Sequence, residues 1–124
     1  MSVNKVILLG NVGTDPKIIN AESGKVVTFS LATGEKYKDR RGEVQEETTW
    51  HNIVVYGKQA DFVEKYIAKG AQVFIEGRIR SRKYTDREGV ERTVFEIVCA
   101  NIQSLGAKPQ QRQSGYYDSN DLPV

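Results

Sequence analysis

Residues 73–84 read Val-Phe-Ile-Glu-Gly-Arg-Ile-Arg-Ser-Arg-Lys-Tyr, and the interpretation of the whole chain starts from them. Successive side chains of a strand point to opposite faces. One face would carry Val73, Ile75, Gly77 and Ile79, and the other Phe74, Glu76, Arg78, Arg80, Arg82 and Tyr84. The second face is a ladder of arginines that ends in a tyrosine. It is either a solvated outer face or a track for a polyanion with flat bases.

The remaining apolar pattern predicts further strands, separated by turns rich in glycine and proline. The predicted strands are residues 3–12, 25–37, 48–56, 71–84 and 90–105, and the turns are residues 13–16, 23–24 and 86–89. Residues 3–12 have apolar side chains on both sides, which predicts that both faces of this strand are covered. Residues 38–47 are strongly polar, so we expect an exposed hairpin loop with Gly42 near its tip.

A short helix is predicted between the third and fourth strands. Phe62, Val63, Tyr66 and Ile67 form one helical stripe, which Gly57 precedes and Gly70 ends. The order of three strands, one helix and two strands predicts an all-β protein, a five-stranded OB-fold barrel. An SH3-like barrel fits less well, because it would not usually place a 12-residue amphipathic helix there.

Composition narrows the functional classes. The chain has 124 residues, which suits one domain, and a formal net charge of only +2. Its single cysteine, Cys99, excludes an internal disulfide and a Cys-rich zinc site, and its apolar surroundings predict a buried, inert thiol. One histidine, His51, without clustered carboxylates argues against an enzyme, a metal or a cofactor. No apolar run approaches 18 residues, so we expect a cytoplasmic protein without a membrane span or signal peptide.

The composition changes after Leu105. Residues 1–105 are predicted to form the barrel, and residues 106–124 are polar enough to predict a disordered tail. The tail ends in an acidic and apolar tip, which by composition alone is a frayed end. The tip residues are Asp118, Asp121, Leu122, Pro123 and Val124.

Aromatic and basic residues alternate along the predicted strands. The candidate stacking residues are Tyr37, Trp50, Tyr56 and Tyr84, and the candidate phosphate contacts are Lys5, Lys36, Arg40, Lys58, Arg80, Arg82 and Lys83. Interleaved aromatic rings and cations are what proteins use to bind single strands with little regard to sequence. Core packing is the competing role, above all for Trp50 and Tyr56, because the apolar Val54 lies between them.

Several spaced motifs resemble bacterial-type single-stranded DNA-binding proteins. They are Asn4–Gly13 with Asp15-Pro16, Thr49-Trp50-His51, Tyr56-Gly57-Lys58, Tyr66-x-x-Lys69-Gly70 and Val73–Asp86. The resemblance covers residues 3–105 and implies an OB-fold homotetramer that wraps single-stranded DNA in replication, recombination and repair, in the cytoplasm at the nucleoid. It maps the stacking positions onto the four aromatic residues above, two of which, Tyr37 and Tyr84, are tryptophan in better-known members.

The same resemblance implies roles for two further parts of the chain. His51 matches a histidine near the family's subunit interface. The tip matches an ending that recruits replication and repair proteins, with Val124 where the family usually has phenylalanine.

Two other functions stay open at this point. The barrel could be a protein-interaction module with the tail as a peptide ligand, or an OB-fold that binds structured RNA. The sequence also leaves open a tetramer or a dimer, the length of DNA bound, cooperativity, and a chromosomal or mobile-element origin.

Overall fold

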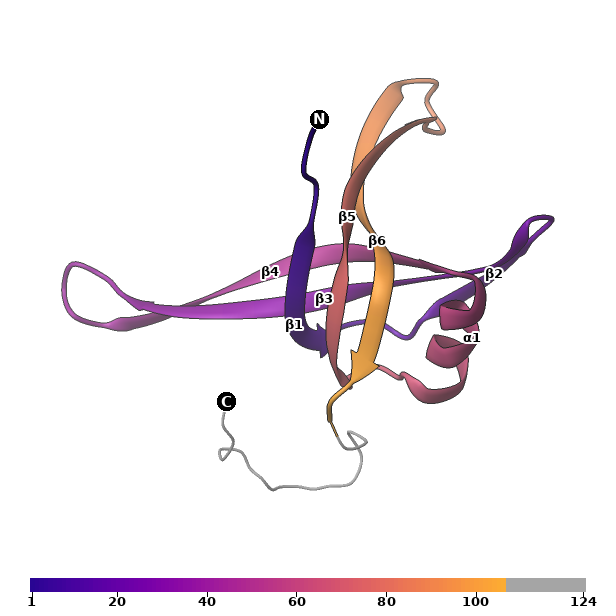
Figure 1. Cartoon of the computed structure of the whole chain (residues 1–124). Coiled ribbons are helices and arrows are strands. Elements are labelled where there is room, and N and C mark those ends of the chain that lie inside the picture. Colours follow the sequence, from indigo (N-terminus) through magenta and orange to yellow (C-terminus); the bar gives the residue numbers. More distant parts are fainter. Residues whose placement is uncertain (107–124) are drawn as a thin grey trace.

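Six strands and one helix make up residues 1–106, the part of the chain that the computed structural model describes (Figure 1). In chain order they are β1 (Val6–Val12), β2 (Lys17–Ala21), β3 (Gly24–Lys38), β4 (Val44–Tyr56), α1 (Gly57–Tyr66), β5 (Gln72–Thr85) and β6 (Glu91–Ser104).

Five of these strands close into a barrel in the order β1-β5-β6-β4-β3, and β1 returns to pair with β3. The helix α1 lies between β4 and β5, the third and fourth barrel strands. This is the predicted all-β OB-fold with one short helix, which is therefore confirmed. The sixth strand, β2, adds to the edge of β3 and was not predicted.

Two short joints close the barrel. β1 pairs with β3 only at Asn11↔Ala32 and Val12↔Leu31. β4 pairs with β6, in parallel, only at Ile53↔Ile97 and Val54↔Val98. The antiparallel ladders β3–β4 and β5–β6 are much longer and run on past these joints. They leave the barrel as the β3–β4 arm (residues 33–49) and the β5–β6 arm (residues 80–96), which point in different directions in Figure 1.

The β3–β4 arm corrects the prediction for residues 38–47. Paired strands reach as far as Lys38↔Val44, so only residues 39–43 form the loop. The prediction was wrong because it required an apolar face for a strand. Beyond the barrel both faces of the arm meet water, and the backbone ladder itself satisfies the polar groups of the chain.

The helix is shorter than predicted because the chain must turn back towards β1. Ile67 already has an extended backbone, with φ −109° and ψ 126°. Gly70 then adopts a left-handed φ of +94° and donates its N–H to the carbonyl oxygen of Val12 at 2.7 Å. On the other side, Lys25 of β3 pairs with Asp61 at 2.8 Å and with Glu64, which anchors α1 to the barrel wall and raises the pKa of Lys25.

The barrel core is built from β-branched and other aliphatic side chains. Leu31, Ile53 and Ile75 are fully buried, and Val63 of α1 closes one end. Cys99 lies in this core, as predicted, and burial raises the pKa of its thiol to about 11. The thiol therefore stays protonated at neutral pH, which makes it a poor nucleophile.

The outer face of β1 is not covered by any other part of residues 1–106. Ile7 is 56% exposed and Leu9 52% exposed. The prediction that residues 3–12 are covered on both faces is therefore wrong for the single chain. Alternation identified the strand correctly, but which element lies on each face is decided by the fold.

The tips of the two arms are built alike, on Asp39 and Asp86. In each tip the aspartate backbone N–H donates to the carbonyl oxygen four residues later, and a left-handed glycine (Gly42 or Gly89, both with φ +81°) closes the turn. The aspartate Oδ1 accepts the backbone N–H groups two and four residues later, each at 2.9 Å. These hydrogen bonds, and the Arg92 guanidinium at 2.9 Å from Asp86, lower the pKa of both carboxyl groups.

Acid should therefore loosen both tips before it unfolds the barrel. A carboxyl group whose pKa is lower in the folded state contributes stability above its unfolded pKa, about 3.9 for Asp, and this contribution is lost as the pH falls through the folded value. We expect the amide resonances of Glu43 and Val90 to shift together below about pH 4, while core amides such as that of Ile53 stay unchanged. Simultaneous loss of core and tip signals would contradict this.

Candidate nucleic-acid interface

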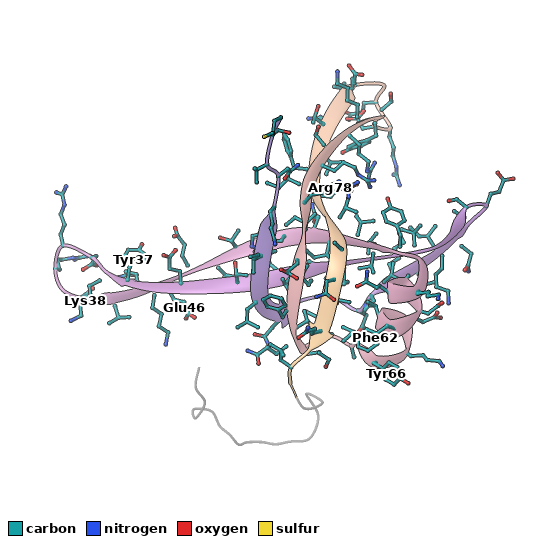
Figure 2. All side chains as sticks on the ribbon, viewed as in Figure 1. Tyr37, Lys38, Glu46, Phe62, Tyr66 and Arg78 are labelled. Carbon is teal, nitrogen blue, oxygen red and sulfur yellow. The ribbon has the colours of Figure 1, made fainter. Side chains whose placement is uncertain are left out.

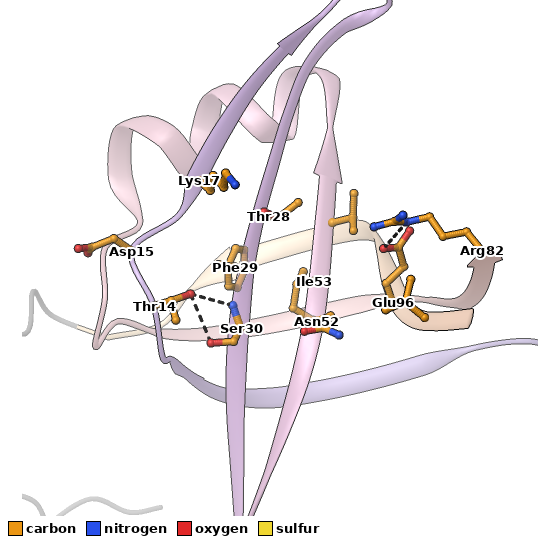
Figure 3. Close-up of a pocket in the computed structure, with 12 residues that line it drawn as sticks. Thr14, Asp15, Lys17, Thr28, Phe29, Ser30, Asn52, Ile53, Arg82 and Glu96 are labelled. Carbon is orange, nitrogen blue, oxygen red and sulfur yellow. Dashed lines mark hydrogen bonds and ion pairs between the residues drawn. The ribbon is translucent and has the colours of Figure 1, made fainter. Parts of the chain in front are cut away.

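One face of the barrel carries a groove of about 440 Å³, shown in Figure 3. Polar and apolar residues of β3 and β4 line its middle, and charged side chains lie at its margins. The lining residues are Thr14, Asp15, Lys17, Thr28, Phe29, Ser30, Asn52, Ile53, Val54, Arg82, Val94 and Glu96.

Strand alternation places two aromatic rings beside this groove. Trp50, Asn52, Val54 and Tyr56 share one face of β4. Asn52 and Val54 line the groove, so Trp50 and Tyr56 flank it. Only Val54 is buried, whereas Trp50 is 60% and Tyr56 41% exposed. The competing role for these two aromatic residues, core packing, is therefore excluded within the chain.

The Trp50 ring rests on the backbone of Gly13. A Cβ atom at Gly13 would lie 2.2 Å from Cζ3 of Trp50, so any side chain there would displace the ring. Beside it, the Thr14 hydroxyl oxygen accepts the Ser30 N–H at 3.1 Å, and Gly13 donates its own N–H to the Ser30 carbonyl oxygen at 2.8 Å. The turn is thus fixed to β3, and it supports the tryptophan ring as a rigid surface.

A buried carboxylate, Glu96, holds the arginine ladder. Glu96 is 5% exposed and accepts the Nε–H of Arg80 at 2.9 Å and the Nε–H of Arg82 at 3.2 Å. Arg80 also donates to the Tyr56 hydroxyl at 2.7 Å, and its guanidinium carbon lies 5.6 Å from the centre of the Tyr56 ring. These contacts raise the pKa of Arg80, with Glu96 the largest cause, so the guanidinium stays charged.

The arginine ladder of residues 73–84 is therefore neither a plain solvated face nor a row of free cations, because Glu96 and Tyr56 hold Arg80 and Arg82 in place. Sequence reasoning missed Glu96, although a lone carboxylate in the apolar run 94–98 was a signal. Arg80 and Glu96 are direct cross-strand partners, and this pairing could be inferred only once the register was known.

The outer aromatic residues lie on separate arms. Tyr37 lies on the β3–β4 arm and Tyr84 on the β5–β6 arm, 48% and 45% exposed respectively. Figure 2 labels Tyr37 next to the end of its arm. Each arm thus carries one exposed aromatic ring, and neither ring lines the groove.

The predicted cations are distributed over the same elements. Lys36 lies on the β3–β4 arm and Arg40 in its tip, Lys83 lies on the β5–β6 arm, and Lys58 is the second residue of α1. Lys5 is the exception, because it pairs with Glu76 at 3.6 Å and lines a different hollow from the groove. The tip residues Asp118, Asp121, Leu122, Pro123 and Val124 lie outside the described residues.

His51 faces away from Trp50, its neighbour in β4. Its Nε2 lies 2.9 Å from the Thr33 hydroxyl oxygen, and the side chain is partly buried.

The sequence profile of the Single-strand binding protein family matches residues 3–105. The chain belongs to this family. It is 43% identical over 119 residues to the single-stranded DNA-binding protein of Neisseria meningitidis, covering 95% of this chain and 68% of that protein. It is 48% identical over 108 residues to single-stranded DNA-binding protein 1 of Chlorobaculum tepidum, covering 86% of this chain and 67% of that protein.

A solved structure of the same family is also similar. The SSB of Plasmodium falciparum, in a complex with ssDNA, superposes with a TM-score of 0.76 at 37% identity. The match covers 86% of this chain and 97% of that one. The fold derived from the sequence pattern is thus the fold of the single-strand binding protein family.

Phe95 is an exposed aromatic residue that sequence reasoning did not select. It is 64% exposed, near the base of the β5–β6 arm. Alternation places it on the side of Ile97 and Cys99, both buried, so the pattern alone indicates a core residue. However, β6 is joined to β4 only at Ile97 and Val98. At Phe95, two residues before Ile97, the same face of β6 is open to solvent.

Residues 1–106 contain no group of three or more His, Cys, Asp or Glu side chains that could hold a metal ion. The only helix in this part of the chain is too short to cross a membrane.

Gly13→Ala should displace the Trp50 ring. The new methyl group would occupy the position of the indole edge. We expect a shifted Trp50 emission maximum with little change in the unfolding midpoint, because the ring can move towards solvent. Gly34→Ala is the matched control, since a Cβ there would meet only Oε2 of Glu46 at 3.9 Å. An emission spectrum identical to the wild type would show that the ring does not rest on Gly13.

Proposed function

We propose that this chain binds single-stranded DNA with little sequence preference, as a non-enzymatic protein. The observation that carries the proposal is the pair of exposed rings, Trp50 and Tyr56, on either side of one groove. Membership of the single-strand binding protein family supports it, as does the similarity to a family structure solved with ssDNA.

Base stacking would supply most of the affinity. Each base stacked on an aromatic side chain contributes about 1–3 kcal/mol. Four platforms, Tyr37, Trp50, Tyr56 and Tyr84, would together contribute on the order of 4–12 kcal/mol before the cost of ordering the strand. Because every base has a flat π-face, this binding would depend little on sequence.

Cations around the platforms would contact phosphates and make binding depend on salt. The proposed contacts are Lys5, Lys36, Arg40, Lys58, Arg80, Arg82 and Lys83. Arg80 already has two partners, Glu96 and Tyr56. We therefore expect it to contribute less to phosphate binding than Arg82.

We further propose that the chain assembles as a homotetramer. Within residues 1–106, β1 pairs on its β3 side only at Asn11 and Val12, which leaves the backbone of Val6–Gly10 open there. Ile7 and Leu9 expose an apolar face on the same strand. An open edge and an apolar face on one short strand favour pairing with further copies of the chain, and the proposed interface includes His51.

The proposed cellular role follows from binding single strands. The protein would protect single-stranded DNA during replication, recombination and repair, in the cytoplasm at the nucleoid. Its tip, from Asp118 and Asp121 to Leu122-Pro123-Val124, would recruit the proteins that act on that DNA.

Deleting residues 118–124 should preserve DNA binding and abolish recruitment.

Removing a platform should weaken binding of oligo-dT. Trp50 is the only tryptophan, so its fluorescence should be quenched as DNA binds. We expect Trp50→Ala and Tyr84→Ala each to lose about 1–3 kcal/mol of binding free energy equally for oligo-dT and oligo-dC, measured by anisotropy of labelled DNA. Tyr66→Ala is the control, because Tyr66 is 61% exposed on α1 (Figure 2). No quenching and no binding at low salt would refute the proposed function.

Glu96→Gln should make binding more salt-dependent. The amide keeps the shape of the side chain but removes the charge that neutralises Arg80 and Arg82. We expect tighter binding at low salt and a slope of log affinity against log salt steeper by up to about one.

Glu22→Gln controls for net charge, since Glu22 is an exposed residue in the turn between β2 and β3, away from the proposed phosphate contacts. A thermal melt of each variant separates altered binding from lost folding. Equal slopes for a folded Glu96→Gln variant and the wild type would show that the freed guanidinium groups do not reach phosphates.

A further inference from the structure

We propose that β2 extends the DNA-binding surface, with Lys17 as a phosphate contact and Ile19 as an apolar support for a base. Sequence reasoning selected neither residue, because it did not predict the strand that carries them. The inference rests on the proposed function and deepens it, since it adds a third strand, beyond β4 and β3, to the surface that holds single-stranded DNA. We call the surface formed by Lys17, Ile19 and Val26 the β2 shelf.

The strand register places the β2 shelf on the same face of the sheet as the groove. Residues that pair directly across antiparallel strands point to the same side. Lys17 of β2 pairs with Thr28 of β3, and both line the groove (Figure 3). Two residues further along each strand, the next row on this face is Ile19↔Val26↔Tyr56. The shelf therefore continues the groove sideways from Tyr56, across β3 and onto β2.

Ile19 offers apolar surface beside the Tyr56 ring. It is 43% exposed, about as much as Tyr56 itself. Neighbouring strands are about 4.8 Å apart, so these two residues lie roughly 10 Å apart with Val26 between them. Arg80 donates to the Tyr56 hydroxyl from the β5 side, away from β3, so the ring does not fold over Val26. A base stacked on Tyr56 would therefore extend over Val26 and shield Ile19 from water, which is favourable for an apolar side chain.

Lys17 is a cation without a carboxylate partner in the described structure. The ion pairs within residues 1–106 do not include it, and Asp15, which also lines the groove, forms none with it. It differs in this from the arginine ladder, whose charge Glu96 partly neutralises. Lys17 and Ile19 are two residues apart, which is roughly 7 Å along a strand. The shelf thus sets an ammonium group beside an apolar side chain, and a nucleotide offers both an anion and a flat ring.

A second copy of the chain is the competing occupant, because β2 is an edge strand with one unpaired side. A lysine on an edge strand opposes the addition of another strand. The apolar face of Ile7 and Leu9 on β1 already offers copies an open edge that is separate from the shelf. Continuity with the groove therefore favours DNA as the occupant.

The first test changes one face of β2 at a time in the full-length protein. Ile19→Thr removes apolar surface from the shelf. Ile18→Thr is the matched control, because Ile18 is 38% exposed and pairs with the buried Val27, on the opposite face. Threonine keeps the β-branched shape that strands favour. We expect Ile19→Thr to weaken oligo-dT binding about 3- to 10-fold and Ile18→Thr to bind like the wild type, with the same mass by light scattering for both.

The second test concerns the charge of Lys17. Lys17→Gln should make the slope of log affinity against log salt less steep by up to about one. Lys65→Gln removes the same charge from an exposed position on α1 and should leave the slope unchanged. In the wild type with labelled isoleucine methyl groups, oligo-dT should shift the Ile19 δ1 methyl resonance upfield through the ring current of the base, and leave that of Ile18 in place.

Four results would overturn the inference. They are an Ile19→Thr affinity within twofold of Ile18→Thr, an unchanged salt slope for Lys17→Gln, an unshifted Ile19 methyl resonance in the complex, and a smaller oligomer for Ile19→Thr, which would assign Ile19 to contact with a second copy. The methyl shift is measured on the wild type, so it decides even where a variant fails to fold. Trp50→Ala would still weaken binding if the proposed function holds, whereas failure of the wild type to bind oligo-dT would refute the function itself.

Discussion

Closure of the barrel through two short joints is the constraint on which the other features depend. β1 must reach both β5 and β3, and only Asn11 and Val12 join it to β3. Gly10 makes this close approach possible, because a Cβ there would lie 2.2 Å from the Ala32 carbonyl oxygen. On the far side, two residue pairs join β4 to β6. A barrel this small uses only part of each long ladder, so the rest of β3–β4 and β5–β6 must project as arms.

The arms explain why Tyr37, Tyr84 and Phe95 are exposed. Inside the barrel, alternation sends every second side chain into the core, as it does for Ile53 and Ile97. Once a ladder passes its joint, no core remains to receive those side chains, and Phe95 becomes exposed only two residues from Ile97. The same geometry sets Tyr37 and Tyr84 on separate arms. The surplus length of the strands thus becomes exposed surface that carries aromatic side chains.

Sequence alone recovered the barrel strands, the helix and the exposure of the four selected aromatic residues, because alternation, helical periodicity and glycine positions are local signals. It failed where a neighbour decides the outcome. β2 pairs with the edge of β3, and all its residues are exposed. Because neither face of β2 is buried, its sequence has no clear alternation of apolar and polar residues. Lys38 and residues 44–47 form strand without being buried, and Phe95 has core periodicity without a core. Ile7 and Leu9 satisfy the pattern of a covered strand although nothing in residues 1–106 covers them.

Glu96 shows why a basic pattern cannot be read as a count of phosphate contacts. A buried carboxylate is unfavourable unless it is paired, and Arg80 and Arg82 together satisfy it. Two guanidinium groups and one carboxylate leave a single net positive charge on this part of the ladder. A phosphate approaching Arg80 would compete with a carboxylate that is already held at hydrogen-bond distance and shielded from water. The ladder therefore acts first as a structural support, which fixes Arg80 against the Tyr56 ring, and only its outward-facing remainder is available to a polyanion. This shifts the weight of recognition from charge to the aromatic surfaces that the support holds in place.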